Sequence, residues 1–181
     1  ETKSGDMDQI HKDKDYEEGA SMALYNSDGT VNFTDGGGIS VSGRGNFSWF
    51  LDKKPYIIKL PEEGDLLGMG TAEKWILLAN AIDNTNLRNK LIYDFAGEFQ
   101  EYWSPECEYV DLYLNGECAG LYLLAEKVEV GENRLNLGEG SYLFNLDLDT
   151  RNADPATCIA VNEGTAAEIQ YPKEISEVHL Q

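Results

Sequence analysis

The chain has 181 residues, enough for one domain with a substantial core, and it carries 14 Lys and Arg against 33 Asp and Glu, a formal net charge of −19. So large a negative excess repels nucleic acid and anionic lipid, which excludes both as expected partners. The longest apolar runs, at 75–79 and 121–125, fall far short of the roughly 20 residues that a membrane helix needs, so no membrane span is expected.

The first part of the chain predicts a polar lead-in followed by a hairpin. Residues 1–18 are heavily charged and offer little to bury, which predicts a flexible segment. Residues 19–181 are expected to form one domain. Within it, the turn residues Asn26–Gly29 lie between two apolar segments, Met22–Tyr25 and Val31–Phe33, as in a β-hairpin.

Cations gather in the next segment, against the overall charge. Strands are predicted at 39–43 and 55–60, and a glycine-flanked arginine, Arg44, follows the first of them. Lys53, Lys54 and Lys59 come shortly afterwards. Cations beside a Gly-rich turn are suited to holding an anion such as phosphate. In the alternative reading, Arg44 is a turn residue bonded to carbonyls and the lysines only solvate a half-exposed strand.

Two helices are expected next, at 72–80 with Thr71 as N-cap and at 85–101. The second projects an apolar stripe that we expect to be buried, formed by Leu87, Leu91, Ile92, Phe95 and Phe99. Arg88 falls inside this stripe. A buried guanidinium needs a carboxylate, carbonyls or a ligand to offset its desolvation. It either extends to a domain edge as a structural residue or meets a ligand or partner.

Residues 109–125 carry the strongest local pattern, two alternating apolar strands joined by Asn115-Gly116, as in a type I′ hairpin. The implied register places Cys107 opposite Leu124 and Cys118 opposite Tyr113, which excludes a Cys107–Cys118 disulfide. All three cysteines of the chain, including Cys158, are therefore expected to be reduced.

Shorter strands are predicted at 141–148, 158–161 and 167–171. The acidic segment 147–154 lacks the Gly and the terminal Glu of an EF-hand loop, so a solvated loop is favoured over a cation site. The last residues read as the start of a helix at Ser176, as if the domain were cut there. Runs of strands around two inserted helices predict an α+β fold with a mostly antiparallel sheet.

Several enzyme classes lack support. The chain contains no Gly-x-Ser-x-Gly, His-Glu-x-x-His or P-loop motif, and its only histidines are His11 and His179. What remains is an order of elements: a Gly-flanked turn, a strand bearing Lys59, helices, a hairpin, and then Glu126-Lys127. Protein kinases arrange a covering loop, a strand lysine and a helix acid in this order.

Several blocks in this order resemble the CotH spore-coat kinase-like family over about residues 20–172. They are Gly43–Trp49, Lys53–Leu60, Leu66–Met69, Trp75–Asn80, Leu87–Leu91, Val110–Gly116 and Gly120–Glu129. Phe47 and Phe50 depart from the family pattern, which has small or polar residues there.

The resemblance implies an atypical protein-kinase fold, of which this chain is the N-terminal part, similar to a kinase N-lobe. It implies transfer of phosphate from ATP, with Mg²⁺, to Ser of secreted or spore-coat proteins, and a location in the spore coat, outside the cell or at its surface. The family's metal motif and catalytic acid have no counterpart in this sequence. We therefore expect no catalytic or metal-binding residue in it, and no catalysis by it alone.

The resemblance also assigns roles. Lys59 is expected to contact the nucleotide phosphates with Arg44 assisting, and Asp94 or Glu98 is the candidate acid on the second helix. The other candidates near the nucleotide are Arg88, Glu126 and Lys127. The expected partners are a nucleotide and a protein substrate. The alternative hypothesis is a non-catalytic secreted scaffold or binding module, with a protein or carbohydrate partner, on the same fold.

Overall fold

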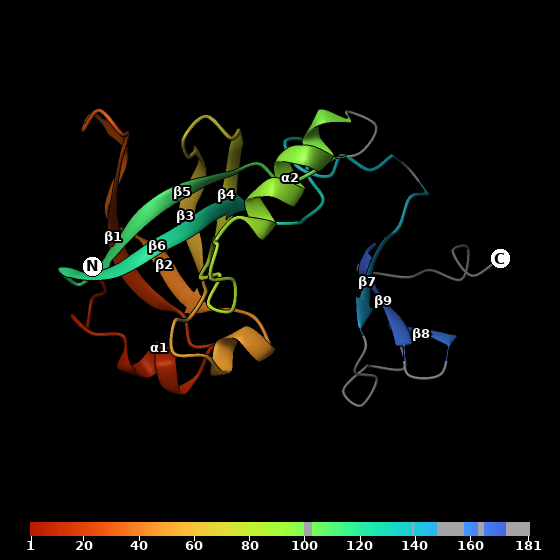
Figure 1. Ribbon diagram of the computed structural model, residues 1–181, viewed down its shortest axis with the longest axis horizontal. Helices are drawn as coiled ribbons and strands as arrows, with labels where there is room; N and C mark the ends of the chain where they lie inside the picture. Colours follow the sequence, from red (N-terminus) through yellow and green to blue (C-terminus); the bar gives the residue numbers. More distant parts are fainter. Residues whose placement is uncertain (100–102, 139, 148–157, 163–164, 173–181) are drawn as a thin grey trace. The chain divides into compact units, whose positions relative to one another are not determined.

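The computed structural model describes residues 1–99, 103–138, 140–147, 158–162 and 165–172. The chain divides into two compact units, Glu1–Glu129 and Val130–Gln181. Each unit is built on its own antiparallel sheet (Figure 1). The acidic segment 148–154 and the helix expected near Ser176 lie outside the described residues.

The first unit is a curled six-stranded sheet in the order β1-β2-β3-β4-β6-β5, with every neighbouring pair antiparallel. Its strands are β1 (Glu18–Tyr25), β2 (Val31–Gly43), β3 (Tyr56–Asp65), β4 (Thr71–Leu78), β5 (Cys107–Leu114) and β6 (Glu117–Glu126). Its helices are α1 (Asp8–Lys12), the 3-10 turn η1 (Phe47–Phe50) and α2 (Arg88–Glu98). The predicted α+β class with a mostly antiparallel sheet is confirmed, although the helices are few and short.

The second unit contains three strands in the order β7-β9-β8. They are β7 (Leu143–Asp147), β8 (Cys158–Asn162) and β9 (Thr165–Tyr171), close to the three strands expected from the sequence. Both pairings are antiparallel.

Alternation along the strands of the first unit produces two apolar faces. The inner face closes around Trp75, whose side chain is fully buried and whose indole N–H donates to the Ala72 carbonyl at 3.2 Å. A smaller cluster on the outer face contains Ile76, Leu123 and the Cys107 thiol, with Tyr93 of α2 packed against it. The two clusters together bury both faces of β4 and β6.

Burial on both faces explains why the helix expected at 72–80 is wrong. Residues Thr71–Leu78 form the strand β4 instead, with Trp75 and Leu77 in the inner cluster and Ile76 in the outer one. A strand covered on both faces reads as a continuous apolar run without alternation, and such a run cannot be told from a buried helix by periodicity alone.

The β5–β6 hairpin is confirmed at its turn. Asn115 and Gly116 have φ values of 52° and 84°, as a type I′ turn requires, and Tyr113 faces Cys118 as expected. A bulge after Leu112 then shifts the register by one residue, so that Cys107 faces Ala125 rather than Leu124. The thiols of Cys107 and Cys118 are free, as predicted, and that of Cys158 is not described.

The segment 1–18, expected to be a flexible lead-in, packs against the sheet in this structure. Ile10 of α1 is fully buried and Met7 nearly so, and both join the inner cluster. Thr2 forms an antiparallel bridge with Ala20 of β1. Two apolar side chains among many charged ones were too weak a signal to predict this packing.

His11 ties this segment to the core through an aromatic cluster. Its Nε2 lies 2.8 Å from the Tyr56 hydroxyl, and its ring stacks on that of Tyr56 at a centroid distance of 6.2 Å. Trp49 meets both rings edge-on. Burial, followed by the nearby charge of Lys54, lowers the pKa of His11 below its usual 6.5. The folded state therefore favours the neutral imidazole.

This lowered pKa predicts a contribution to stability that is present above about pH 6.5 and is lost as the pH falls through the lower folded-state pKa, because the unfolded chain then binds the proton more readily. In urea titrations at pH 7.5 and pH 5, the unmodified protein should lose more unfolding free energy than His11→Gln. Parallel losses in the two proteins would show that His11 is not held neutral. Both proteins retain His179 and every carboxylate, so their shared acid response cancels.

Candidate functional site

The glycines around Arg44 are required by packing and turn geometry. A Cβ on Gly43 would overlap the Trp49 indole, and Gly45 has a φ of +86°, which L side chains rarely adopt. Trp49 belongs to η1 and is itself buried. The Gly-flanked turn therefore allows the Trp49 side chain to pack against Gly43. Packing and turn geometry explain why both positions are glycine, so a bound phosphate is not needed to explain them.

Lys53 and Lys54 act structurally. The Lys54 ammonium donates to the carbonyls of Trp49 and Leu51 at 2.9 and 3.2 Å and lies 5.0 Å from the centre of the Trp49 ring. The Lys53 ammonium donates to the Leu121 carbonyl and lies 4.5 Å from the ring centre of Tyr122. Lys53 therefore holds the segment after η1 onto β6, and Lys54 holds it onto η1. The two lysines have structural partners and do not form one anion-binding cluster with Lys59.

Lys59 differs from these two lysines. It is exposed in the middle of β3, where it faces Ser40 of β2 and Lys74 of β4. Among the residues that the structure describes, no carboxylate lies within 4.0 Å of its ammonium. Two adjacent lysines on one face make an electropositive point on an acidic protein.

Arg44 follows the last residue of β2 and pairs with Pro55, just before β3, on the same face of the sheet as Lys59. Its N–H donates to the Pro55 carbonyl at 3.2 Å, and Lys59 follows Pro55 by four residues, roughly 13 Å along a strand at about 3.3 Å per residue. Burial lowers the pKa of the Arg44 guanidinium, and Tyr93 of α2 acts in the opposite direction. Arg44 therefore lies next to α2, half-buried.

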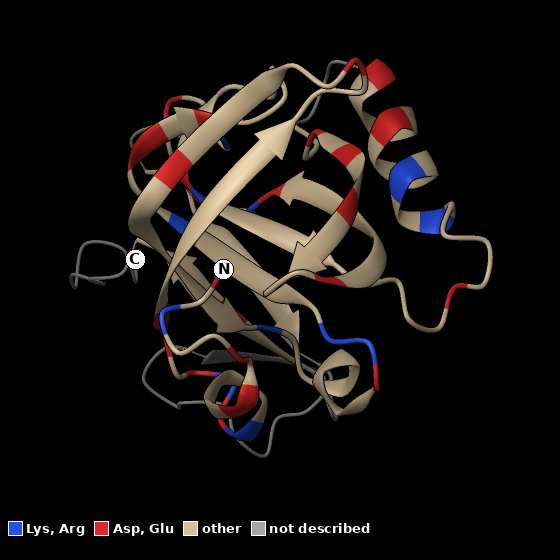
Figure 2. Cartoon of the chain, turned by 90° about the vertical axis from the view of Figure 1, so that its left-hand side faces the viewer, with Lys and Arg blue, Asp and Glu red and all other residues tan. Residues whose placement is uncertain are grey.

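Among the described residues, neither candidate acid of α2 is paired with Lys59. Asp94 accepts a hydrogen bond from Lys90 at 2.7 Å, and Lys90 also approaches Glu108 of β5 at 3.9 Å. Glu98 is exposed, one turn further along. Figure 2 shows the basic residues of α2 in its N-terminal half and the acidic ones in its C-terminal half. Neither acid forms an ion pair with Lys59 in the described part of the chain.

The expectation that Arg88 lies on a buried face is wrong. Its side chain is 77% exposed, and its Nε lies 3.8 Å from Asp83, which also accepts from the Arg88 backbone N–H at 2.9 Å. The stripe expected to be buried is exposed as well, with Leu91 at 65% and Phe95 at 60%. The helix meets the sheet through Tyr93 instead, which a helical projection does not single out.

Glu126 and Lys127 lie in different environments. Glu126 faces Trp75 at the end of β6, is only 3% exposed, and accepts a hydrogen bond from the Glu106 N–H at 2.9 Å. Lys127 lies 3.3 Å from Glu129. Arg44 and Lys59 therefore share the outer face of the sheet with α2, whereas Glu126 lies on the inner face.

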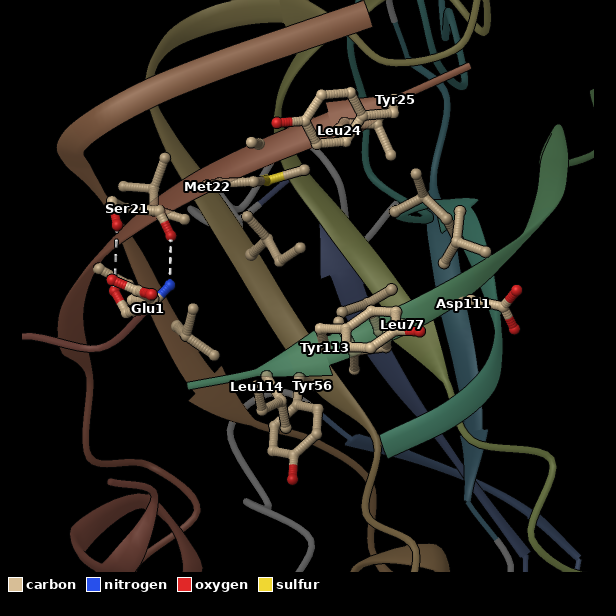
Figure 3. A pocket seen from close by; sticks show the side chains of 18 of the residues that line it. Glu1, Ser21, Met22, Leu24, Tyr25, Tyr56, Leu77, Asp111, Tyr113 and Leu114 are labelled. Carbon is tan, nitrogen blue, oxygen red and sulfur yellow. Dashed lines mark hydrogen bonds between the residues drawn. The ribbon is translucent and has the colours of Figure 1, made fainter. Parts of the chain in front are cut away.

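A cavity that the sequence did not reveal lies on the inner side of the first unit. Its volume is about 880 Å³, and both edge strands line it, β1 on one side and β5 on the other (Figure 3). Half-buried apolar side chains, among them Met22 and Leu112, face this space. The alternation of each strand is visible in the sequence. No sequence feature indicates that the two strands are the edges of one sheet.

The comparison with protein families decides the affiliation of the chain. The model of the CotH kinase protein family matches residues 41–177, which is most of the sequence. The chain belongs to the CotH family. A search of curated proteins found no match. None of the helices in the described residues is long and apolar enough to cross a membrane.

The CotH match begins within β2 and includes Arg44, Lys59, α2 and the β5–β6 hairpin. It leaves β1 and the packed N-terminal segment outside. In the described part of this CotH chain, no three His, Cys, Asp or Glu side chains are grouped so as to hold a metal ion.

The packing of Trp49 against Gly43 predicts that a side chain at position 43 destabilises the fold. Gly43→Ala should lower the unfolding free energy by about 1–3 kcal/mol, because the added methyl overlaps the indole and forces the core to shift. Gly36→Ala is the matched control, since a Cβ there meets nothing within 4 Å. Urea denaturation measures both. Equal stability of the two variants would contradict the packing role of Gly43.

Proposed function

We propose that this chain is the nucleotide-binding, N-terminal part of a CotH-type atypical protein kinase. The complete kinase transfers phosphate from ATP to Ser of secreted or spore-coat proteins, and it acts in the spore coat, outside the cell or at its surface. Membership of the CotH family supports this proposal. A likeness of the six-stranded sheet to a kinase N-lobe is part of the same proposal.

One observation carries the proposal: Lys59, a strand lysine with no ion pair among the described residues, lies on the face of the sheet that α2 packs against. Lys59 is exposed on that face, and Tyr93 of α2 packs against the outer cluster of the same sheet. Protein kinases use a strand lysine to hold the phosphates and an acid on a neighbouring helix to orient it.

The charges around Lys59 fit a polyanion. Lys59 and the neighbouring Lys74 supply two positive charges, and Arg44 supplies a third at the far end of the face. In this arrangement Lys59 binds the phosphates, while Arg44, half-buried beside Tyr93, supplies a second contact. Mg²⁺ would neutralise charge on the phosphates, as in other phosphoryl transfers.

The helix acid requires a change of partner. Asp94 is bound to Lys90 at 2.7 Å, so it reaches Lys59 only if that ion pair opens. The pair is partly exposed, and such pairs contribute little, about 0.3–0.5 kcal/mol for helix pairs of this spacing. Glu98 has no such bond among the described residues and is the less hindered candidate.

Lys59→Ala tests the site. Mg·ATP should raise the melting temperature of the unmodified chain, because a ligand that binds only the folded state stabilises it. The variant should bind at least about tenfold more weakly, through loss of a charge-assisted hydrogen bond worth roughly 1.5–3 kcal/mol. Lys12→Ala removes an equal charge from α1 and should bind normally. Calorimetry with Mg·ATP gives the dissociation constants, and equal values for the two variants would remove Lys59 from the site.

A non-catalytic binding module is the second candidate function. The ion pair between Lys90 and Asp94 favours it, since that pair leaves Lys59 without an acid within 4.0 Å among the described residues. On this account the acidic surface meets a protein or carbohydrate partner. Absence of both heat and thermal stabilisation with Mg·ATP would favour the binding module over the kinase.

A further inference from the structure

Helix α2 presents an apolar stripe on the side that faces away from the sheet. Tyr93 packs against the outer cluster from one side of the helix, and the stripe lies on the opposite side. Its members are large apolar side chains that are between 57% and 65% exposed, namely Leu87, Leu91, Ile92, Phe95 and Phe99. Together they expose about 600 Å² of apolar surface, which is the upper end of what monomeric proteins leave uncovered, and such patches mark interaction sites.

The helix is held by its other side, so the stripe is fixed in place without being covered. The Lys90 ammonium approaches Glu108 of β5 at 3.9 Å, and Tyr93 belongs to the outer cluster. Within the stripe, the rings of Phe95 and Phe99 meet edge-on at a centroid distance of 4.8 Å. A partner therefore meets a surface that is already ordered, which reduces the entropy lost on binding.

The two ends of the stripe carry opposite charges. Arg88 stands in the first turn of α2 and Glu98 at its end, and both side chains are exposed (Figure 2). The first turn contains no acid and the last turn contains no base. This order opposes the helix dipole, which favours acids near the N-terminus and bases near the C-terminus. It becomes favourable when a second α2 lies antiparallel to the first, because each end then meets the opposite charge.

An antiparallel copy of α2 also fits the stripe in size. A two-fold axis at the level of Tyr93 brings Leu91 beside Phe95 of the second copy. The same axis brings Leu87 beside Phe99 of the second copy. Each leucine thus meets a phenylalanine, and the contact closes because both copies use the same patch.

We propose that the stripe is a self-association surface, on which two copies of this chain pair antiparallel through their α2 helices. The two-fold axis sets Arg88 level with Glu98 of the second copy at both ends of the pair. Within one copy these two residues are about 15 Å apart along the helix, so they meet only between copies. Charge complementarity fixes the antiparallel direction and the register.

The pair is weak by the standards of stable dimers. Two stripes bury at most about 1,200 Å², the lower limit of specific interfaces, which corresponds to a dissociation constant on the order of 10 µM. The net charge of −19 on each copy opposes pairing at low ionic strength. At about 0.15 M salt, the Debye length of roughly 8 Å screens most of that repulsion.

The pairing is independent of the proposed nucleotide site, and its measurement contains no nucleotide. It engages Glu98, so that in the pair Asp94 is the candidate helix acid that remains for Lys59.

Sedimentation velocity of the full chain tests the pairing. A reductant keeps the exposed Cys118 as a thiol. Between about 2 and 200 µM, the sedimentation coefficient should rise from that of one chain to that of two. Arg88→Glu sets two acids against each other at both ends, and Glu98→Arg sets two bases, so each variant should weaken the dimer at least about tenfold. A monomer at every concentration, or equal association by both variants and the unmodified chain, would overturn the proposal.

An equal mixture of the two charge variants shows which residues meet. One end of a mixed pair keeps the original contact between Arg88 and Glu98, and the other end carries it with the charges exchanged. The mixture should therefore associate about as strongly as the unmodified chain, although neither variant does so alone. Failure of the mixture to associate more strongly than each variant would contradict the proposed register and with it the proposal.

A further pair of variants tests the apolar part of the contact. Phe95→Gln should weaken the dimer at least about tenfold, because its ring no longer covers apolar surface of the second copy. Phe50→Gln removes an exposed ring from η1 and should leave the dimer unchanged. Both side chains are more than half exposed, so both variants should fold, and melting curves check this.

Two outcomes would assign the stripe or the dimer differently, and each would overturn the proposal. A monomeric chain that loses thermal stability with Phe95→Gln would show that residues of the same chain cover the stripe. A dimer that persists in Phe95→Gln and in both charge variants would show that the copies meet through another surface.

Discussion

The alternation of side chains across one curled antiparallel sheet governs the whole first unit. One face closes around Trp75 and buries Ile58, Leu77 and Leu124 with it. The other face carries a thinner apolar cluster, which is enough to hold α2 but leaves Lys59 in solvent. Successive residues of β3 point to opposite sides of the sheet, so Ile58 packs in the core while Lys59 lies at the candidate site. Burial raises the pKa of Cys107, on the outer face, to about 11, so its thiol acts as a packing residue rather than a nucleophile.

The cations that distinguish this acidic chain serve two purposes. Lys53 and Lys54 donate to backbone carbonyls and lie over the rings of Tyr122 and Trp49, so they fix the segment between η1 and β3. That segment leads into β3, whose pairing with β2 and β4 decides which face Lys59 occupies. The glycines beside Arg44 contribute in the same way, through the seating of Trp49. The motif that stands out in the sequence is thus mainly structural, because its glycines and two of its lysines pack and anchor the segment around Trp49.

Local signals predicted local structure well. The Asn115-Gly116 turn, the first hairpin and the strands of the second unit were all readable from turn chemistry and alternation. Features that depend on tertiary packing against the sheet could not be predicted in this way. The strand β4 is apolar on both faces and resembled a helix, α2 packs through Tyr93 rather than through its most apolar stripe, and Ile10 docks from a highly charged segment. For the candidate site, the sequence supplied Arg44 and Lys59 but not the partners of Asp94, Arg88 and Glu126, which are set by tertiary contacts.

In the proposed function, the outer face of the sheet, between Arg44 and Lys59 and beside α2, is the side that meets a nucleotide. Backbone amide chemical shifts followed during a Mg·ATP titration test this claim directly. We expect saturable shifts in Arg44, in Lys59 and its neighbour Lys74, and in α2, with little change at Met22–Tyr25 of β1. Shifts confined to the β1–β5 cavity, or no saturable shift at all, would contradict it.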